Sequence, residues 1–91
     1  MIVRRLVIHG RVQGVFYRGW AVETARALGL RGWVRNRRDG TVEALIAGHE
    51  DALEQMIERC HEGPDAALVE RVEVEDAADE PPAGFAQRPT V

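Results

Sequence analysis

The sequence contains no lysine, no serine and a single cysteine, Cys60, among its 91 residues. All twelve basic residues are arginine, so a Schiff-base lysine and the lysine of a Walker phosphate-binding loop are both absent. Without serine, a Ser-His-Asp hydrolase is excluded. One cysteine can form neither an internal disulfide nor a multi-cysteine metal site, and we therefore expect a reducing, cytoplasmic location.

Long hydrophobic runs are also lacking. No apolar segment approaches the roughly 18 residues that a membrane-spanning helix needs, and Met1 leads directly into a strand-like segment instead of a signal-peptide core. We therefore expect no membrane partner. The length and the 45% hydrophobic content are those of one globular domain covering residues 1–91.

Charge is distributed unevenly along the chain. Residues 1–49 hold nine arginines against three acids, a net charge of +6, whereas residues 50–91 hold three arginines against twelve acids, a net charge of −9. An acidic protein with one positive region suits a small anionic ligand better than a long polyanion such as a nucleic acid. The alternative is ordinary solvated surface charge that happens to segregate.

Hydrophobic periodicity predicts a β-α-β-β-α-β order of elements. Gly29 follows the first helix where a left-handed C-terminal cap is favoured, and Asp39-Gly40 marks a tight turn between the second and third strands. The expected strands are residues 3–9, 32–36, 41–47 and 68–75, and the expected helices are residues 17–28 and 50–61.

This order predicts a ferredoxin-like α+β sandwich, in which a four-stranded antiparallel sheet carries two helices on one face. The polar segment 76–84 is expected to be a loop. Residues 85–90 can add a short strand at the border of the sheet, where Pro89 is tolerated.

The segment from Gly10 to Arg18 joins the first strand to the first helix and is our first candidate site. Glycines at 10 and 14 permit a tight backbone whose N–H groups converge on an anion, and the following helix adds the positive end of its dipole. Arg18, in the first helical turn, can hold two phosphate oxygens at once. The alternative is a plain strand-to-helix turn with a solvated Arg18.

Asn36 is the second candidate, because it ends the second predicted strand beside a tight turn. Its carboxamide both donates and accepts hydrogen bonds, as the positioning of a neutral water requires. The alternative is that Asn36 only caps the turn.

Together, the two segments closely resemble the acylphosphatase family. The stretch from Gly10 to Arg18, with Tyr17 where an aromatic residue (often Phe) is usual, is similar to the phosphate loop of that family. The stretch Gly32-Trp33-Val34-Arg35-Asn36, continued through Gly40 and Val42 to Gly48, is similar to its second signature. The resemblance covers nearly the whole chain and implies the same fold as the periodicity.

The resemblance implies hydrolysis of the carboxyl-phosphate bond of acyl phosphates without metal or cofactor. Arg18 then binds the phosphoryl group and Asn36 orients the attacking water. The amides that cradle the phosphoryl oxygens are those of Gln13, Gly14, Val15, Phe16, Tyr17 and Arg18.

Other reactive side chains are weaker candidates for a functional site. The three histidines have no metal-ligand spacing, and Cys60 lies on the apolar stripe of the second helix, where a core role is favoured. Trp33 is expected on the strand face opposite Asn36, with no assigned role. The arginines at 35, 37 and 38 could steer an anionic substrate or simply be solvated.

Two other functions remain as alternatives. A ferredoxin-like RNA-binding module stacks bases on aromatic residues of its central strands, and the apolar residues considered for that platform include no aromatic side chain. They are Leu6, Ile8, Val42, Ala44 and Ile46. A non-catalytic phosphate-binding domain is the other alternative. We expect a monomer that binds an acyl phosphate and inorganic phosphate, and no nucleic acid.

Overall fold

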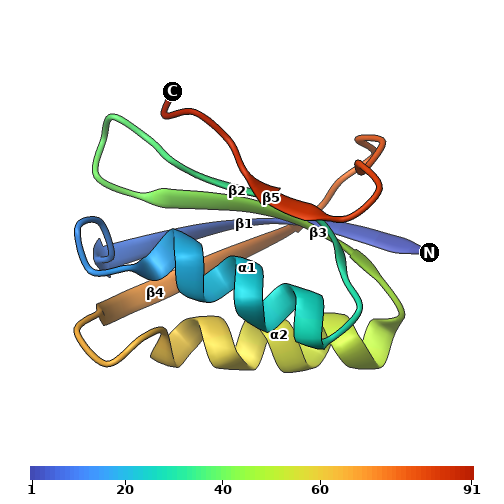
Figure 1. The fold of residues 1–91 in the computed structure, drawn as a ribbon, viewed down its shortest axis with the longest axis horizontal. Coiled ribbons are helices and arrows are strands. Elements are labelled where there is room, and N and C mark those ends of the chain that lie inside the picture. The colour runs from blue at the N-terminus through green and yellow to red at the C-terminus, as the bar shows by residue number, and fades with distance from the viewer.

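Five strands form one sheet in the order β4-β1-β3-β2-β5, and both helices cover the same face of it (Figure 1). The computed structural model describes all residues from 1 to 91. Neither helix is long and apolar enough to cross a membrane. In chain order the elements are β1 (Ile2–Arg11), α1 (Tyr17–Ala27), β2 (Arg31–Asn36), β3 (Val42–Gly48), α2 (Glu50–Glu62), β4 (Leu68–Asp76) and β5 (Phe85–Gln87).

The predicted βαββαβ sandwich is confirmed, but the prediction of a four-stranded antiparallel sheet is wrong in the number of strands. β5 pairs parallel with β2, so the sheet is mixed and has five strands. Phe85 drives this addition, because its buried side chain joins the core cluster beneath the sheet. The strand ends at Gln87, short of the predicted residue 90, although the N–H of Val91 still donates to the carbonyl of Asn36 (3.2 Å).

Alternating residues of the strands face the helices and form the core. Full burial of each large aliphatic side chain contributes roughly 1.5–3 kcal/mol. The core-facing residues include Leu6, Ile8, Val34, Val42, Ala44 and Ile46 from the sheet, Ala21 and Ala25 from α1, and Leu53, Met56 and Cys60 from α2.

The opposite face of the sheet bears on the RNA-binding alternative. The five apolar residues weighed for a base-stacking platform all lie in the core beneath the helices, so they cannot form one. The register places Arg5 opposite Leu45 and Val7 opposite Glu43 on the other face of the two central strands. No aromatic residue stands at these positions either.

α1 ends as the sequence predicts. Gly29 adopts a φ of +70°, and the N–H of Leu30 donates to the carbonyl of Ala25 (2.9 Å) while the N–H of Gly29 donates to that of Arg26 (3.1 Å). This pair of bonds is a Schellman motif, which satisfies carbonyls that the helix end leaves free. The motif turns the chain directly into β2 and so fixes where β2 begins.

Residues 77–84, for which only a polar loop was predicted, connect the two opposite edges of the sheet. The connection crosses the face away from the helices (Figure 1). Arg5 holds it through both carboxylate oxygens of Asp79 (3.1 Å), and Arg31 donates to the carbonyls of Pro81 (2.8 Å) and Pro82 (2.9 Å). The loop is therefore a tethered crossing that delivers β5 to the side of β2.

Candidate active site

A small cavity lies where the β1–α1 loop, the first turn of α1, the end of β2 and β5 meet. Its volume is about 130 Å³. Arg18 is the only charged residue in its wall, and no carboxylate, histidine or cysteine lines it. The lining residues are Val12, Gly14, Phe16, Tyr17, Arg18, Gly19, Asn36 and Gln87.

The loop that leads into α1 alternates between left-handed and ordinary backbone conformations. Gly14 (φ +74°) and Phe16 (φ +68°) are both left-handed, and Val15 between them is not. Such alternation turns successive N–H groups toward one point. The first helical bond runs from the N–H of Trp20 to the carbonyl of Phe16 (3.0 Å), and no amide of residues 13–18 donates to a backbone carbonyl. The start of α1 thus presents unpaired N–H groups together with the positive end of its dipole.

Arg18 is the second residue of α1 and lines the cavity from the helix side. Its side chain is half-buried, and none of the ion pairs of the protein involves it. A guanidinium without a carboxylate partner keeps all of its donors for an anion. Arg18 thus lies in the first turn of α1, beside the loop, as the sequence predicts.

Asn36 reaches the cavity from the sheet because it lies on the same face of β2 as the buried Val34, at the strand end that α1 leaves uncovered. Its Oδ1 is buried and has no hydrogen-bond partner within the protein. The turn is capped instead by Asp39, whose Oδ1 accepts hydrogen bonds from the N–H (3.0 Å) and Oγ1 (2.6 Å) of Thr41. These bonds hold the pKa of Asp39 below its usual value. Asn36 is therefore not the turn cap that the alternative interpretation assumed.

The side chain of Gln13 joins the loop to the turn that follows Asn36. Its Nε2 donates to the carbonyls of Arg37 (2.7 Å) and Thr41 (2.8 Å). The carboxamide therefore points away from the cavity, and Gln13 does not line it. Only the main-chain N–H of Gln13 belongs to the unpaired N–H groups of the loop. This link holds Asn36 and the amide loop at one end of the molecule.

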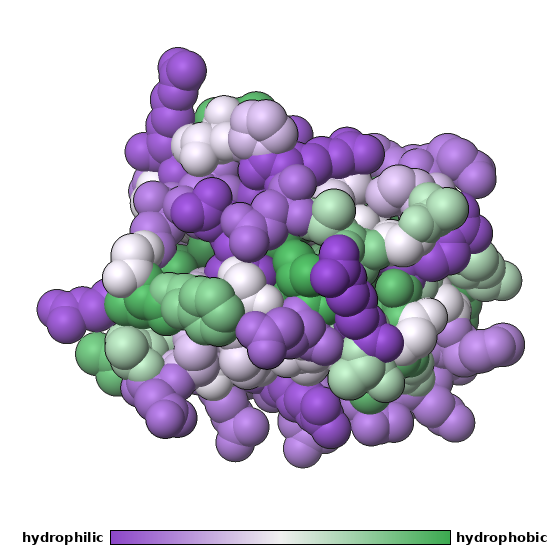
Figure 2. All heavy atoms as spheres, in the orientation of Figure 1, coloured by the Kyte–Doolittle hydropathy of each residue, from purple (hydrophilic) through white to green (hydrophobic).

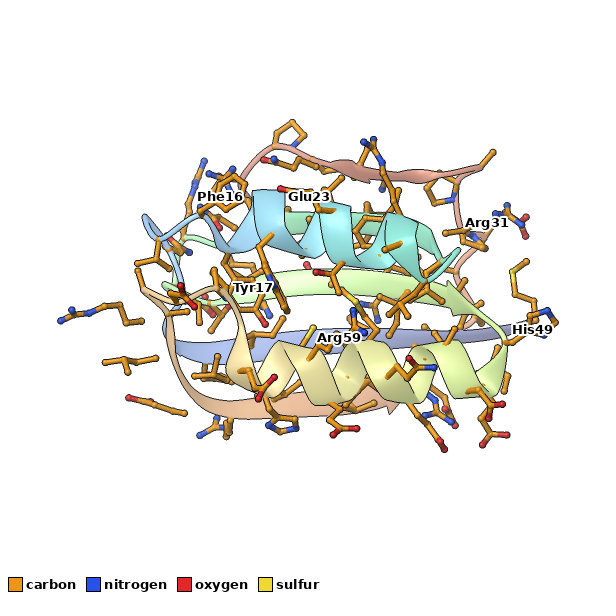
Figure 3. The ribbon with its side chains drawn as sticks, turned by 60° about the horizontal axis from the view of Figure 1, so that its bottom comes forward. Phe16, Tyr17, Glu23, Arg31, His49 and Arg59 are labelled. Carbon is orange, nitrogen blue, oxygen red and sulfur yellow. The ribbon has the colours of Figure 1, made fainter.

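Phe16 and Tyr17 extend to opposite sides of the start of α1 (Figure 3). The buried Tyr17 donates its hydroxyl to the carbonyl of Cys60 in α2 (2.7 Å), and burial raises the pKa of its phenol. Burial also raises the pKa of the Cys60 thiol to about 11, in keeping with the predicted core position. Neither group is poised for proton transfer in the cavity.

Sequence reasoning missed part of this site and left open whether Arg35 steers a substrate. Gln87 was not singled out, although alternation from the buried Phe85 puts it on the same strand face. The side chain of Val15 packs against the core and does not line the cavity, so only its main-chain N–H is available for the predicted cradle. Arg35 donates to Glu43 (2.8 Å) and lies over Trp33 on the opposite face, so it does not point toward the cavity.

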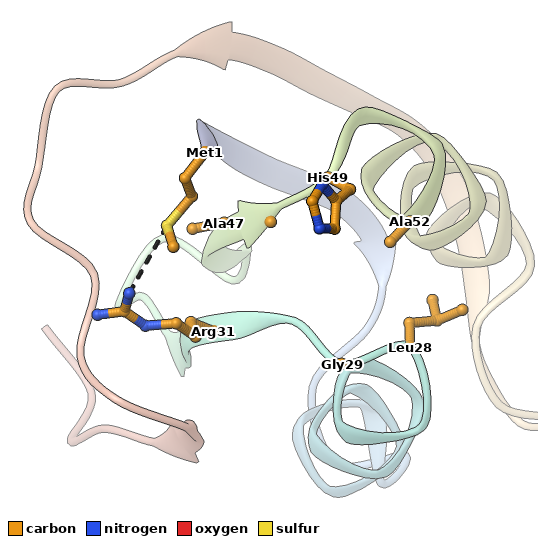
Figure 4. A pocket seen from close by; sticks show the side chains of 8 residues that line it. Met1, Leu28, Gly29, Arg31, Ala47, His49 and Ala52 are labelled. Atoms are coloured by element: carbon orange, nitrogen blue, oxygen red, sulfur yellow. Dashed lines mark hydrogen bonds between the residues drawn. The ribbon is translucent and has the colours of Figure 1, made fainter.

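A second cavity, of about 210 Å³, contains none of the predicted site residues (Figure 4). Arg31 borders it but is engaged, since it donates to the carbonyls of Pro81 and Pro82 and to the sulfur of Met1 (3.7 Å). The remaining wall is largely apolar, and it includes the side chains of Leu28, Ala47 and Ala52. The larger hollow thus lacks the free cation and the unpaired amides of the smaller one.

Comparison with known proteins agrees with this geometry. The acylphosphatase family model matches residues 4–87. The chain is 52% identical over 90 residues to an acylphosphatase of Rhizorhabdus wittichii, covering 99% of this chain and 91% of that protein. It is 58% identical over 90 residues to an acylphosphatase of an Acidovorax species, covering 99% and 93%.

A solved structure gives the same result. The crystal structure of acylphosphatase from Bacillus subtilis superposes with a TM-score of 0.92 at 35% identity, covering 97% of this chain and 99% of that one. The fold is an α+β sandwich with a small cavity at the N-terminus of its first helix. The chain belongs to the acylphosphatase family, whose members hydrolyse acyl phosphates.

The link made by Gln13 can be tested by its removal. Replacement Gln13→Leu keeps the bulk but leaves the carbonyls of Arg37 and Thr41 without a donor, so we expect a loss of about 1–3 kcal/mol in the free energy of unfolding. Urea denaturation measures the loss. The matched control is Gln55→Leu, at an exposed position of α2, which should change stability by less than about 0.5 kcal/mol. Equal stability of the two variants would contradict a structural role for the link.

Proposed function

We propose that this chain hydrolyses acyl phosphates to a carboxylate and inorganic phosphate, with Arg18 and Asn36 as its catalytic residues. One observation supports this most directly. An unpaired guanidinium, a run of unpaired amides and the unpartnered Oδ1 of Asn36 surround a single cavity. A cation and N–H donors suit a phosphoryl group, and an amide oxygen suits a water beside it.

The phosphoryl group occupies the cavity in this proposal. Arg18 donates to two of its oxygens, and the amides from Gln13 to Arg18 donate to the same group from the loop. Because phosphoryl transfer depends mainly on positioning and on stabilisation of charge at the equatorial oxygens, these donors supply most of what the transition state needs. Arg37 and Arg38, in the turn tied to the loop by Gln13, add positive charge at the same end of the molecule.

Asn36 orients the attacking water. Its Oδ1 accepts a hydrogen bond from that water and directs a lone pair of the water oxygen at phosphorus. The cavity wall contains no carboxylate, histidine or cysteine, and the hydroxyl of Tyr17 is committed to Cys60. The proton of the water therefore passes to a phosphoryl oxygen of the substrate.

The leaving group needs no general acid. The P–O bond to the acyl oxygen breaks and releases a carboxylate, whose conjugate acid has a pKa of about 4, so the carboxylate leaves unprotonated at neutral pH. An acyl phosphate dianion and water thus give one carboxylate and one dihydrogen phosphate anion. A phosphate monoester of an alcohol would expel a far more basic alkoxide, and this site offers no acid to protonate it.

We propose that the chain acts as a monomer on a small molecule, without nucleic acid, membrane or cofactor. The unpaired Cys60 also supports a reducing compartment.

The activity itself is tested with the purified chain and benzoyl phosphate. We expect release of phosphate from benzoyl phosphate, at least about 10³-fold slower release from p-nitrophenyl phosphate because of the poorer leaving group, and no change on addition of excess chelator. Phosphate binding without turnover would instead indicate the non-catalytic domain. Loss of activity in chelator that Mg²⁺ restores would contradict a metal-free mechanism.

Arg18→Gln removes the only charge in the cavity wall. We expect kcat/KM for benzoyl phosphate to fall by roughly 10³-fold or more, as for other arginines that stabilise a transferred phosphoryl group, and inhibition by inorganic phosphate to weaken. Steady-state kinetics measure both effects. The matched control is Arg59→Gln, at an exposed position of α2, which should retain wild-type kinetics. Undiminished turnover by Arg18→Gln would overturn the assignment.

Asn36→Ala removes the acceptor for the water but none of the donors to phosphate. We therefore expect kcat to fall by about 10²-fold or more, while the inhibition constant of inorganic phosphate changes much less. The reverse pattern, weaker phosphate inhibition at nearly normal kcat, would assign Asn36 to anion binding instead of water positioning.

A further inference from the structure

Phe16 is the one exposed aromatic residue of the chain, and it lies at the rim of the cavity. Phe16 is 65% exposed, whereas Tyr17, Trp33 and Phe85 are each at most 5% exposed and Trp20 is packed against the core. The surface view shows hydrophobic atoms gathered at the end of the molecule where β1 runs into α1 (Figure 2). Core packing does not explain an aromatic ring held at that end.

The backbone and a neighbouring glycine hold this ring in place. Phe16 adopts the left-handed region (φ +68°, ψ 20°), which costs an ordinary residue about 1–2 kcal/mol. Its ring lies against Gly19, where an added Cβ would clash with the ring edge. The ring thus occupies space that a side chain at position 19 would fill.

The size of the cavity divides the substrate into two parts. A volume of about 130 Å³ corresponds to roughly four water molecules, well below the 300 Å³ or more of sites that enclose a whole organic ligand. The phosphoryl group fits such a space and leaves little room beside it, which places the acyl group across the rim. The exposed rim side chains are those of Phe16 and Gln87, and Phe16 provides the apolar surface.

We propose that Phe16 is a specificity-determining residue that favours acyl phosphates with an aromatic acyl group. The inference rests on the proposed function, because it assumes that the phosphoryl group binds in the cavity. An aromatic acyl group gains an offset or edge-to-face contact with the ring of Phe16, and an acetyl group has no ring to place there.

The test compares benzoyl phosphate with acetyl phosphate and measures the ratio of their kcat/KM values. Effects on the shared phosphoryl site cancel in this ratio. Phe16→Gly and Phe16→Asn both tolerate the left-handed backbone and remove the ring. We expect the ratio to fall by roughly threefold to tenfold in both variants, mainly through KM, since an aromatic contact contributes about 0.5–1.5 kcal/mol. The matched control, Leu68→Ala, removes an equally exposed apolar side chain (65%) that does not line the cavity, and should keep the wild-type ratio.

An unchanged ratio in either Phe16 variant would overturn the inference while leaving the proposed hydrolysis intact. If the wild-type chain hydrolyses neither substrate, the proposed function fails. In that case, the dissociation constants of phenylphosphonate and methylphosphonate are compared in the wild-type chain and in both Phe16 variants. A phenyl preference that both variants lose supports the role of the ring, and one that persists rejects it.

Discussion

Two hydrogen bonds from the Gln13 carboxamide hold together the two segments on which the site depends. The loop before α1 supplies the unpaired amides and leads to Arg18, and the end of β2 supplies Asn36. The two segments belong to different elements, and β1 is not adjacent to β2 in the sheet, because β3 lies between them. A link at the strand ends therefore holds the loop that leads to Arg18 close to Asn36. Without this link, the two segments would be connected only through two successive strand pairings, β1 with β3 and β3 with β2. Phosphoryl transfer depends on such positioning more than on reactive side chains.

The β2–β3 turn is held from several sides, which explains why Gln13 finds two carbonyls at fixed positions. Asp39 accepts two bonds from Thr41, the N–H of Arg37 donates to the carbonyl of Thr41, and the C-terminal segment pairs with Asn36 and Arg38 through the backbone of Val91. Asn36 is therefore set in a backbone bonded on both edges. The side-chain Oδ1 of Asn36 has no hydrogen-bond partner within the protein, and the surrounding turn holds this free oxygen in place.

Much of this arrangement was accessible from the sequence. Periodicity separated Val34 and Asn36 from Trp33 and Arg35, and this parity alone decides that Asn36 faces the helix side. The Gly14 turn and the position of Arg18 in the first turn of α1 were equally local. Features that depend on distant segments were not predicted. The parallel pairing of β5 needs the crossing of residues 77–84, and the ion pair of Arg35 needs Glu43 on the next strand. The left-handed backbone of Phe16 was not predicted for a different reason, because an aromatic residue rarely adopts this conformation.

The burial of Cys60 has a consequence for a protein that handles activated acyl groups. Mixed anhydrides are electrophiles that transfer their acyl group to amines and thiolates as well as to water. The chain has no lysine, and its one thiol is nearly inaccessible and has a raised pKa, which keeps it protonated at neutral pH. Arginine, whose guanidinium keeps its proton, carries all of the basic side-chain charge that holds an anion. The protein thus attracts a reactive electrophile without offering it a side-chain amine or an accessible sulfur nucleophile.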